Sequence, residues 1–165
     1  MRIAEECQVV AGIIPVDLQT AANPGDWVSM KNYDHLSIIV YTGVGTDDDD
    51  EVITLDQATN VAAAGTKTLN IKEIFHKVGD TTVADVSLFT RVTQTAANGY
   101  DTVAIDGAEN EAIYVIEIDR GELDGDNDFD CVQVNVADVG GNAMIGCAFY
   151  ILSEPRYAGI EAIGN

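Results

Sequence analysis

The apolar residues of this chain fall into short segments that are rich in β-branched side chains and separated by clusters of Gly, Asn, Asp and Thr. This spacing is typical of an all-β domain. The clearest segment, 130–138, alternates valines with polar residues: Val132, Val134 and Val136, with Gln133 and Asn135 between them. A period of two predicts a half-buried strand, with the valines on one face and Cys131 on the polar face.

Three further segments carry apolar residues at both odd and even positions: 35–43, 111–119 and 145–154. They are predicted to be central strands that are covered on both sides or lie at an interface. Two others, 51–59 and 87–95, mix Thr and charged residues with apolar ones. We expect these two to be outer strands.

The remaining segments are less regular. In 68–79 the apolar residues follow a period of 3.6, but the neighbouring strands favour β structure, so we interpret the segment as a strand with a bulge. The stretches 62–68 and 95–102 are predicted to be loops, and 121–130 is a predicted turn cluster.

About eight strands, with short turn signals and no sustained helical pattern between them, predict a single domain over residues 1–165. We expect an antiparallel β-sandwich of the jelly-roll type, and a small up-and-down β-barrel is the alternative. Residues 153–165 leave the last strand through Pro155. They are predicted to form an extended C-terminal tail, either a frayed end or a segment that reaches over a neighbouring subunit.

The chain has 8 basic and 28 acidic residues, which give a formal net charge of −20. A surface this negative repels phosphate backbones, so nucleic acid is not expected as a partner. Self-repulsion also strains the compact state, and close packing, a basic protein surface or bound cations would offset it.

Cysteine usage and the start of the chain bear on location. Cys7, Cys131 and Cys147 are an odd number without C-x-x-C spacing, so neither a disulfide framework nor a zinc site is indicated, and a cytosolic origin is expected. The first residues lack the basic start and continuous apolar centre of a signal peptide. No apolar run reaches the ~20 residues that cross a bilayer, so a membrane location is not expected.

Five consecutive carboxylates, Asp47 to Glu51, stand between two apolar segments. Neighbouring side chains in an extended loop diverge, so the run does not suit the several convergent oxygens that Ca²⁺ needs. Gly43 and Gly45 precede it and favour a turn. The run is predicted to be a solvated loop, and replacing Asp47 to Asp50 with Asn and Ser is expected to leave the fold intact.

A second acidic stretch places carboxylates at alternate positions: Asp124, Asp126, Asp128 and Asp130. It begins like a calcium-binding loop, but Phe129 stands where that loop needs glycine and Asn135 where it needs a bidentate glutamate. Asp124, Asp126 and Asp128 are therefore weak metal candidates in a turn, and no cofactor is expected.

The sequence contains neither of two common catalytic motifs. The two histidines, His35 and His76, form no H-E-x-x-H pair, and the four serines lie in no G-x-S-x-G elbow. In so acidic a chain, two carboxylates at glycosidase distance arise by chance, so a hydrolase with paired acids has little support. The chain is not expected to be an enzyme.

Three stretches carry a resemblance: IIPVDLQTAANPGDWVSMKNYDHLSIIVYTG (13–43), EAIYVIEIDRGELD (111–124) and DCVQVNVADVGGNAMIGCAFYILSEPRYAG (130–159). They resemble a family of small virion proteins that tailed bacteriophages and prophages carry with their head genes. The recurring elements are GDWVSMKNY, VADVGGNA and the closing YILSEPRYA. None of them is a catalytic motif.

This resemblance implies a head decoration, or cement, protein that binds the outside of the capsid lattice. The implied partners are the phage major capsid protein and further copies of the chain, in a homodimer or homotrimer. The implied location is the capsid exterior, and the host cytoplasm during assembly. Candidate contact residues are Trp27, Pro155, Arg156 and Tyr157; Trp27 would otherwise be a buried cap on one end of the sandwich.

Two alternative functions remain open. Phage proteins of similar size and β content also build tails and necks. The acidic turns and Trp27 would also suit a calcium-dependent carbohydrate-binding β-sandwich.

Overall fold

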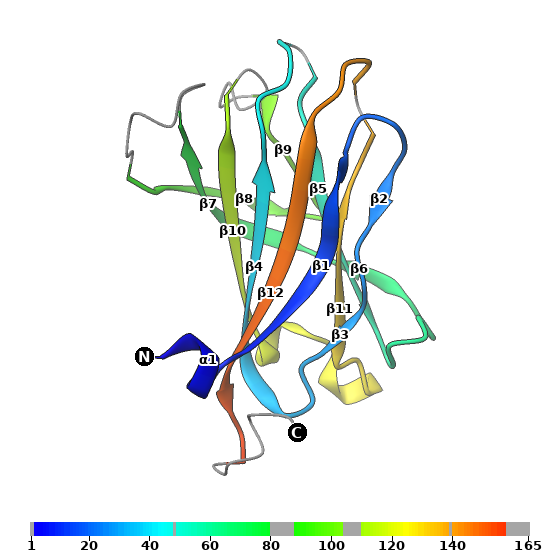
Figure 1. Ribbon diagram of the computed structural model, residues 1–165. Coiled ribbons are helices and arrows are strands. Elements are labelled where there is room, and N and C mark those ends of the chain that lie inside the picture. Colours follow the sequence, from blue (N-terminus) through cyan, green and yellow to red (C-terminus); the bar gives the residue numbers. More distant parts are fainter. Residues whose placement is uncertain (1, 48, 80–87, 104–109, 139, 158–165) are drawn as a thin grey trace.

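The computed structural model describes residues 2–47, 49–79, 88–103, 110–138 and 140–157, which form two antiparallel β-sheets packed face to face (Figure 1). Sheet I contains, in spatial order, β1 (Gln8–Asp17), β12 (Ile145–Pro155), β4 (Tyr33–Thr42), β10 (Ala112–Asp119), β7 (Ile71–Val78) and β8 (Thr90–Ala97). Sheet II contains β2 (Asn23–Pro24), β11 (Cys131–Val136), β5 (Val52–Ala58) and β6 (Lys67–Leu69), with β3 (Val28–Ser29) also paired to β11 and β9 (Gly99–Asp101) to β5. The helical elements in the described residues include α1 (Ile3–Glu6) and two 3₁₀ turns, η2 (Arg120–Glu122) and η3 (Gly125–Asn127).

The strands pair in a nested order. β1 pairs with β12, β2 and β3 with β11, and β4 with β10, so early strands pair with late strands in reverse order. β5 pairs with β6, the next strand in the chain. This is the jelly-roll arrangement, to which β7 and β8 add a hairpin beyond β10. The predicted jelly-roll sandwich is therefore confirmed, and the described strands do not close into a barrel. Eight of the twelve described strands have six or more residues.

The three segments that are apolar on both faces became β4, β10 and β12, which lie side by side within sheet I as predicted. The segment 87–95 contributes β8 at the sheet edge, also as predicted, apart from Ser87, which lies outside the described residues. The expectation for 51–59 is wrong, because β5 lies inside sheet II between β11 and β6. A half-buried strand of a sandwich alternates in the same way at the centre and at the edge, so the pattern could not decide its position.

The segment 68–79 contains two strands. β6 belongs to sheet II and β7 to sheet I, and the chain crosses between them at exposed Asn70, which has buried Leu69 and Ile71 on either side. A register shift against β8 lies between Ile71 and Glu73, in agreement with the expected bulge.

The predicted loop over 95–102 is wrong. β8 continues to Ala97, and β9 follows with Tyr100 buried in the core. Gly99 permits this pairing, because a Cβ at that position would lie 3.1 Å from Thr54 Cγ2 of β5. The small and polar residues that suggest a loop here instead allow a close approach of two strands.

The core lies between the two sheets. Its members are apolar side chains that alternate along the strands, among them Leu36, Ile38, Val40, Ile53, Leu55, Ile116, Val132, Val134 and Val136. The valines of β11 point inward as predicted, but Cys131 on the opposite face is also buried. Its thiol lies 3.1 Å from Asp130 Oδ1, and burial raises the pKa of Cys131 to about 12. Cys131 therefore lies on the predicted face of the strand, and that face is covered at this position.

The last strand extends further than predicted, and the predicted turn cluster is present. β12 runs to Pro155, so the tail predicted from residue 153 begins later, and residues 158–165 of that tail lie outside the described part. The turn cluster at 121–130 is confirmed and contains η2 and η3. None of the helices among the described residues has the length and apolar content to span a membrane.

Candidate interaction surface

The side of sheet I that faces away from the core is apolar in its middle. Strand register aligns its outward side chains in rows, and the central row crosses five strands: Ala11, Phe149, Ile39, Val115 and Phe75. The neighbouring rows contribute Cys147, Tyr41 and Ile113 on one side and Val9 and Ile151 on the other, and Phe89 borders the face just before β8. We call these eleven residues the outer face.

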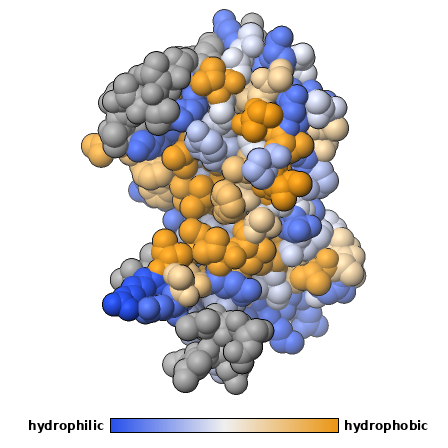
Figure 2. All heavy atoms as spheres, in the orientation of Figure 1, coloured by the Kyte–Doolittle hydropathy of each residue, from blue (hydrophilic) through white to orange (hydrophobic). Residues whose placement is uncertain are grey.

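Several side chains of the outer face are open to solvent. The exposed fraction is 40% for Phe149, 51% for Val9 and 52% for Phe89. Figure 2, in the orientation of Figure 1, shows hydrophobic residues gathered in a band across the middle of the molecule. A depression of about 230 Å³ lies in this face, lined by Phe75, Phe89, Val115 and Glu117. Contiguous apolar surface of this kind marks interaction sites more often than chance exposure does.

Most charged groups around the outer face contact their neighbours, and Lys77 of β7 extends the row of Tyr41 and Ile113. His35 Nδ1 lies 2.9 Å from Asp119 Oδ1, and His35 Nε2 lies 2.9 Å from Glu117 Oε2. Burial alone would lower the pKa of His35, but its hydrogen bonds to Asp119 and Glu117 outweigh burial, so the pKa of His35 is raised above 6.5. A protonated imidazole can donate to both carboxylates at once.

Two other acids close to this face are also engaged. The Tyr41 hydroxyl donates to Glu111 Oε2 at 2.8 Å, and Arg91 forms an ion pair with Glu73 on the β7–β8 hairpin. The face is therefore apolar in its middle and has few unpartnered charges at its edge.

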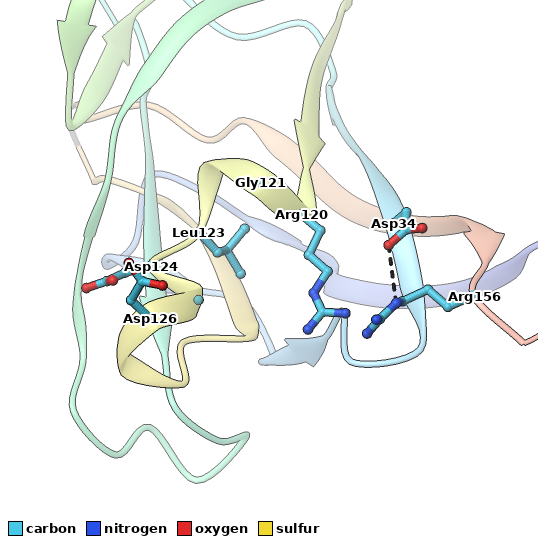
Figure 3. A pocket seen from close by; sticks show the side chains of 8 residues that line it. Asp34, Arg120, Gly121, Leu123, Asp124, Asp126 and Arg156 are labelled. Carbon is cyan, nitrogen blue, oxygen red and sulfur yellow. Dashed lines mark ion pairs between the residues drawn. The ribbon is translucent and has the colours of Figure 1, made fainter.

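A second hollow, of about 530 Å³, lies where β12 ends, beside η2 and η3 (Figure 3). It is lined by Asp34, Arg120, Gly121, Leu123, Asp124, Gly125, Asp126 and Arg156. Arg156 Nε pairs with Asp34 Oδ1 at 3.5 Å, and Arg120 points into the space between this pair and the two other aspartates. Candidate contact residue Arg156 thus lines the same hollow as two of the weak metal candidates, at its opposite end.

The three metal candidates do not converge. Asp124 forms an ion pair with Lys67 and accepts hydrogen bonds from Asn127 Nδ2 at 3.0 and 2.9 Å, and these contacts, the one to Lys67 first, lower the pKa of Asp124. Asp126 and Asp128 are exposed. Within the described residues, no group of three or more His, Cys, Asp or Glu side chains is placed to hold a metal ion.

The other contact candidates differ in exposure. Trp27 is half-buried in the short connection between β2 and β3, which fits neither a fully buried cap nor a fully open anchor. Pro155 and Arg156 are exposed, and Tyr157 is 71% exposed with its ring 5.9 Å from Arg156 Cζ. Arg156 is held in place, because its backbone N donates to Asn32 O at 2.9 Å.

The acidic run from Asp47 to Glu51 is only partly a solvated loop. Asp47 is exposed as predicted, and Asp48 lies outside the described residues. Asp49, in contrast, is 7% exposed, and its carboxylate accepts hydrogen bonds from Gly141 N (3.1 Å), Asn142 N (3.1 Å) and Asn142 Nδ2 (2.8 Å). The Asn142 side chain and the backbone of Gly141 lower the pKa of Asp49. The prediction of a solvated loop is therefore wrong at Asp49, and the replacement of Asp47 to Asp50 is now expected to remove these hydrogen bonds.

Glu51 is fully buried between the sheets. Its Oε2 accepts a hydrogen bond from Thr102 Oγ1 at 2.9 Å, and the Tyr114 hydroxyl lies 3.5 Å from the same oxygen. Glu51 Oε1 and Thr42 Oγ1 have no hydrogen bond of ordinary geometry in the described part of the chain, although Thr42 is near enough to lower the pKa of Glu51. Burial raises the pKa of Glu51, and the hydrogen bond from Thr102 offsets this only in part. The partners are distant in sequence, so the run itself gave no signal that two of its acids are buried.

No known family model matches the sequence, and no curated protein matches it. Among solved structures, the fold is similar to that of the SPBc2 prophage-derived protein YomS, with a TM-score of 0.42 and 11% sequence identity over 88% of this chain and 93% of that one. A likeness at this level does not bear on function.

Proposed function

We propose that this protein is a non-enzymatic structural component of a tailed-phage particle, and specifically a head decoration protein that binds the outside of the capsid and stabilises it. The outer face carries this proposal, because an extended apolar surface on a paired jelly-roll frame suits a protein whose task is to make contacts. The sequence resemblance to small virion proteins suggests that these contacts are made within a phage particle.

The capsid contact is proposed at the end of the sandwich where β12 ends. Pro155, Arg156 and Tyr157 are exposed there, and Arg156 is fixed by Asp34 and Asn32. Such a small contact is sufficient if the protein is multivalent, because linked weak sites raise avidity by roughly 10²–10⁴. The proposed partner is the phage major capsid protein.

The test is binding of the purified protein to empty capsids of its phage, followed by heat and low-salt challenge of particles with and without it. Tyr157→Ser is expected to weaken capsid binding, whereas Val61→Ser, which also truncates an exposed apolar residue, is expected to leave it unchanged. Failure to bind capsids, together with equal resistance of both kinds of particle, would exclude the decoration role.

A place in the tail or neck is the second candidate within the same class. Copy number separates the two roles, because a decorated lattice carries hundreds of copies per particle and a neck ring carries few. Quantitative mass spectrometry of purified particles gives this number.

A further inference from the structure

We propose that the outer face is where two copies of this chain associate, sheet I against sheet I, around a two-fold axis that runs parallel to β4. This inference deepens the proposed function, because it names what covers that surface. It rests on the size of the face, on the placement of charge and on a match between one side chain and one depression.

The size of the face suits a specific contact. Strands in a sheet lie about 4.8 Å apart, so the five strands from β1 to β7 span about 24 Å, and three outward rows span about 20 Å along the strands. The flat footprint, which also contains the polar positions Ser37, Glu117 and Lys77, is then roughly 500 Å². This is of the same order as the ~600–800 Å² that each partner buries in specific interfaces.

Charge points to a second copy rather than to a basic partner. Two chains that each carry a net charge of −20 can approach closely only where the local field is weak. Among the groups that border the outer face, Arg91 neutralises Glu73, while Glu117 and Asp119 share the single His35. Glu111 keeps its charge beside the neutral Tyr41 hydroxyl, and Lys77 adds a positive charge on β7. Their net charge is small beside the −20 of the whole chain. A basic partner would instead be drawn to exposed acids elsewhere, such as Asp47 and Asp126.

The shape of the face is self-complementary under the proposed axis. Phe149, Ile39 and Val115 lie in one row on β12, β4 and β10. Rotation about an axis parallel to β4 places β12 of each copy over β10 of the other, and therefore Phe149 over the depression. Three apolar side chains line that depression together with Glu117, whose carboxylate is bonded to His35. That depression, about 230 Å³, exceeds the ~150 Å³ cavity that accepts a benzene ring. The contact is reciprocal, as a two-fold interface requires.

The test is sedimentation equilibrium of the full chain at several concentrations. The wild type is expected to be a dimer, and Phe149→Glu is expected to raise the dimer dissociation constant at least ~30-fold, the effect typical of losing an interface hot spot. Val61→Glu, the same kind of change at an exposed residue outside the face, is expected to leave the dimer intact. Circular dichroism checks that each variant is folded, and Phe149→Ser replaces the charged variant if that one is not.

Three results would overturn the inference: a wild type that stays monomeric at about 100 µM, a folded Phe149 variant that dimerises like the wild type, or a Val61→Glu variant that dissociates equally. Capsid binding separates this inference from the proposed function. A monomer that binds capsids removes the dimer and keeps the decoration role, whereas a dimer that binds no capsid does the reverse. Loss of capsid binding by Phe149→Glu at unchanged mass would assign the face to the capsid instead.

Discussion

Asp49 ties two loops together that are far apart in the sequence. Its two carboxylate oxygens accept three hydrogen bonds from Gly141 and Asn142, and its backbone carbonyl accepts one from Gln19 Nε2 at 3.3 Å. A Cβ on Gly140 would lie 2.4 Å from Asp49 Oδ1, so glycine is needed beside the carboxylate. A residue in an acidic run thus acts as a structural link.

Asp49→Ser is expected to lower the melting temperature by several degrees, because three backbone and side-chain donors lose their acceptor. Asp47→Ser, the same change at an exposed position of this loop, is the matched control and should melt like the wild type. Because the pKa of Asp49 is lowered in the fold, its contribution is complete above its ordinary pKa of 3.8 and disappears as pH falls through the lower folded value. Equal melting of both variants at pH 7 would contradict this role; differential scanning calorimetry measures it.

The pKa shift of Glu51 makes the free energy of unfolding change with pH in the opposite direction to that of Asp49. The folded protein binds its proton more tightly than the unfolded chain, because burial raises its pKa. The free energy of unfolding should therefore fall as pH rises from the ordinary pKa of 4.5 towards the raised folded value. Above that window, the buried carboxylate is charged and one of its oxygens lacks a donor.

Glu51→Gln is expected to raise the free energy of unfolding at pH 7 by on the order of 1 kcal/mol, since a neutral amide keeps an acceptor for Thr102 and removes the buried charge. It should also flatten the pH dependence above 4.5. Urea denaturation at several pH values measures both effects. Glu154→Gln changes an exposed acid and serves as the control. If the free energy of unfolding of Glu51→Gln had the same pH dependence as the wild type, Glu51 would not be a destabilising buried charge.

At the scale of elements, the edge of sheet II is interrupted. β2 and β3 both pair with β11 but are separated by Gly25, Asp26 and Trp27. The Tyr150 hydroxyl, from β12 in sheet I, fills this gap: it accepts from Val134 N at 2.9 Å and donates to Asp26 O at 2.9 Å. One fully buried side chain therefore joins the two sheets where a strand is missing.

Tyr150→Phe is expected to lower the free energy of unfolding by about 1–3 kcal/mol, because it leaves the Val134 N–H unpaired in the core. Tyr157→Phe removes a hydroxyl from an exposed ring and should have no measurable effect. Chemical denaturation measures the free energy of unfolding of both variants. If Tyr150→Phe is as stable as the wild type, only the ring of Tyr150, and not its hydroxyl, contributes to stability.

The same elements show how far the sequence can be interpreted. Alternation predicted β11, and segments apolar on both faces predicted β4, β10 and β12, because these signals depend on local period alone. The central position of β5, the pairing of β9 and the hydroxyl bridge of Tyr150 depend on contacts between distant segments, so no local pattern encodes them. The apolar residues on both faces of these strands predicted a second apolar side of the sheet. The sequence alone does not distinguish a second side that is buried within the domain from one that is exposed.

At the scale of the whole molecule, charge is distributed unevenly. The net charge is −20, yet the acids that border the outer face are paired with neighbouring groups. The repulsion between two copies therefore arises mainly from charges away from the proposed contact. Salt shortens the reach of such charges, to about 10 Å at 0.1 M and about 3 Å at 1 M.

Raising NaCl from about 0.05 to 0.5 M is expected to tighten self-association and to raise the melting temperature, because both are opposed by long-range repulsion. Light scattering and thermal melts across the salt series test this. Weaker association at high salt would show instead that ion pairs between opposite charges hold the copies together.

The nested order of pairing has a consequence for how the protein folds. β1 finds its partner only in β12, and β4 lies between β10 and β12, so few strands can complete their pairing with neighbours in sequence. Folding that depends on such distant pairing is slow. During synthesis, β4 keeps one edge unpaired, and its outward apolar side chains uncovered on that side, until β12 has been made. That interval is when the nascent chain is most exposed to aggregation, and it favours slow translation or a chaperone over rapid expression at high temperature.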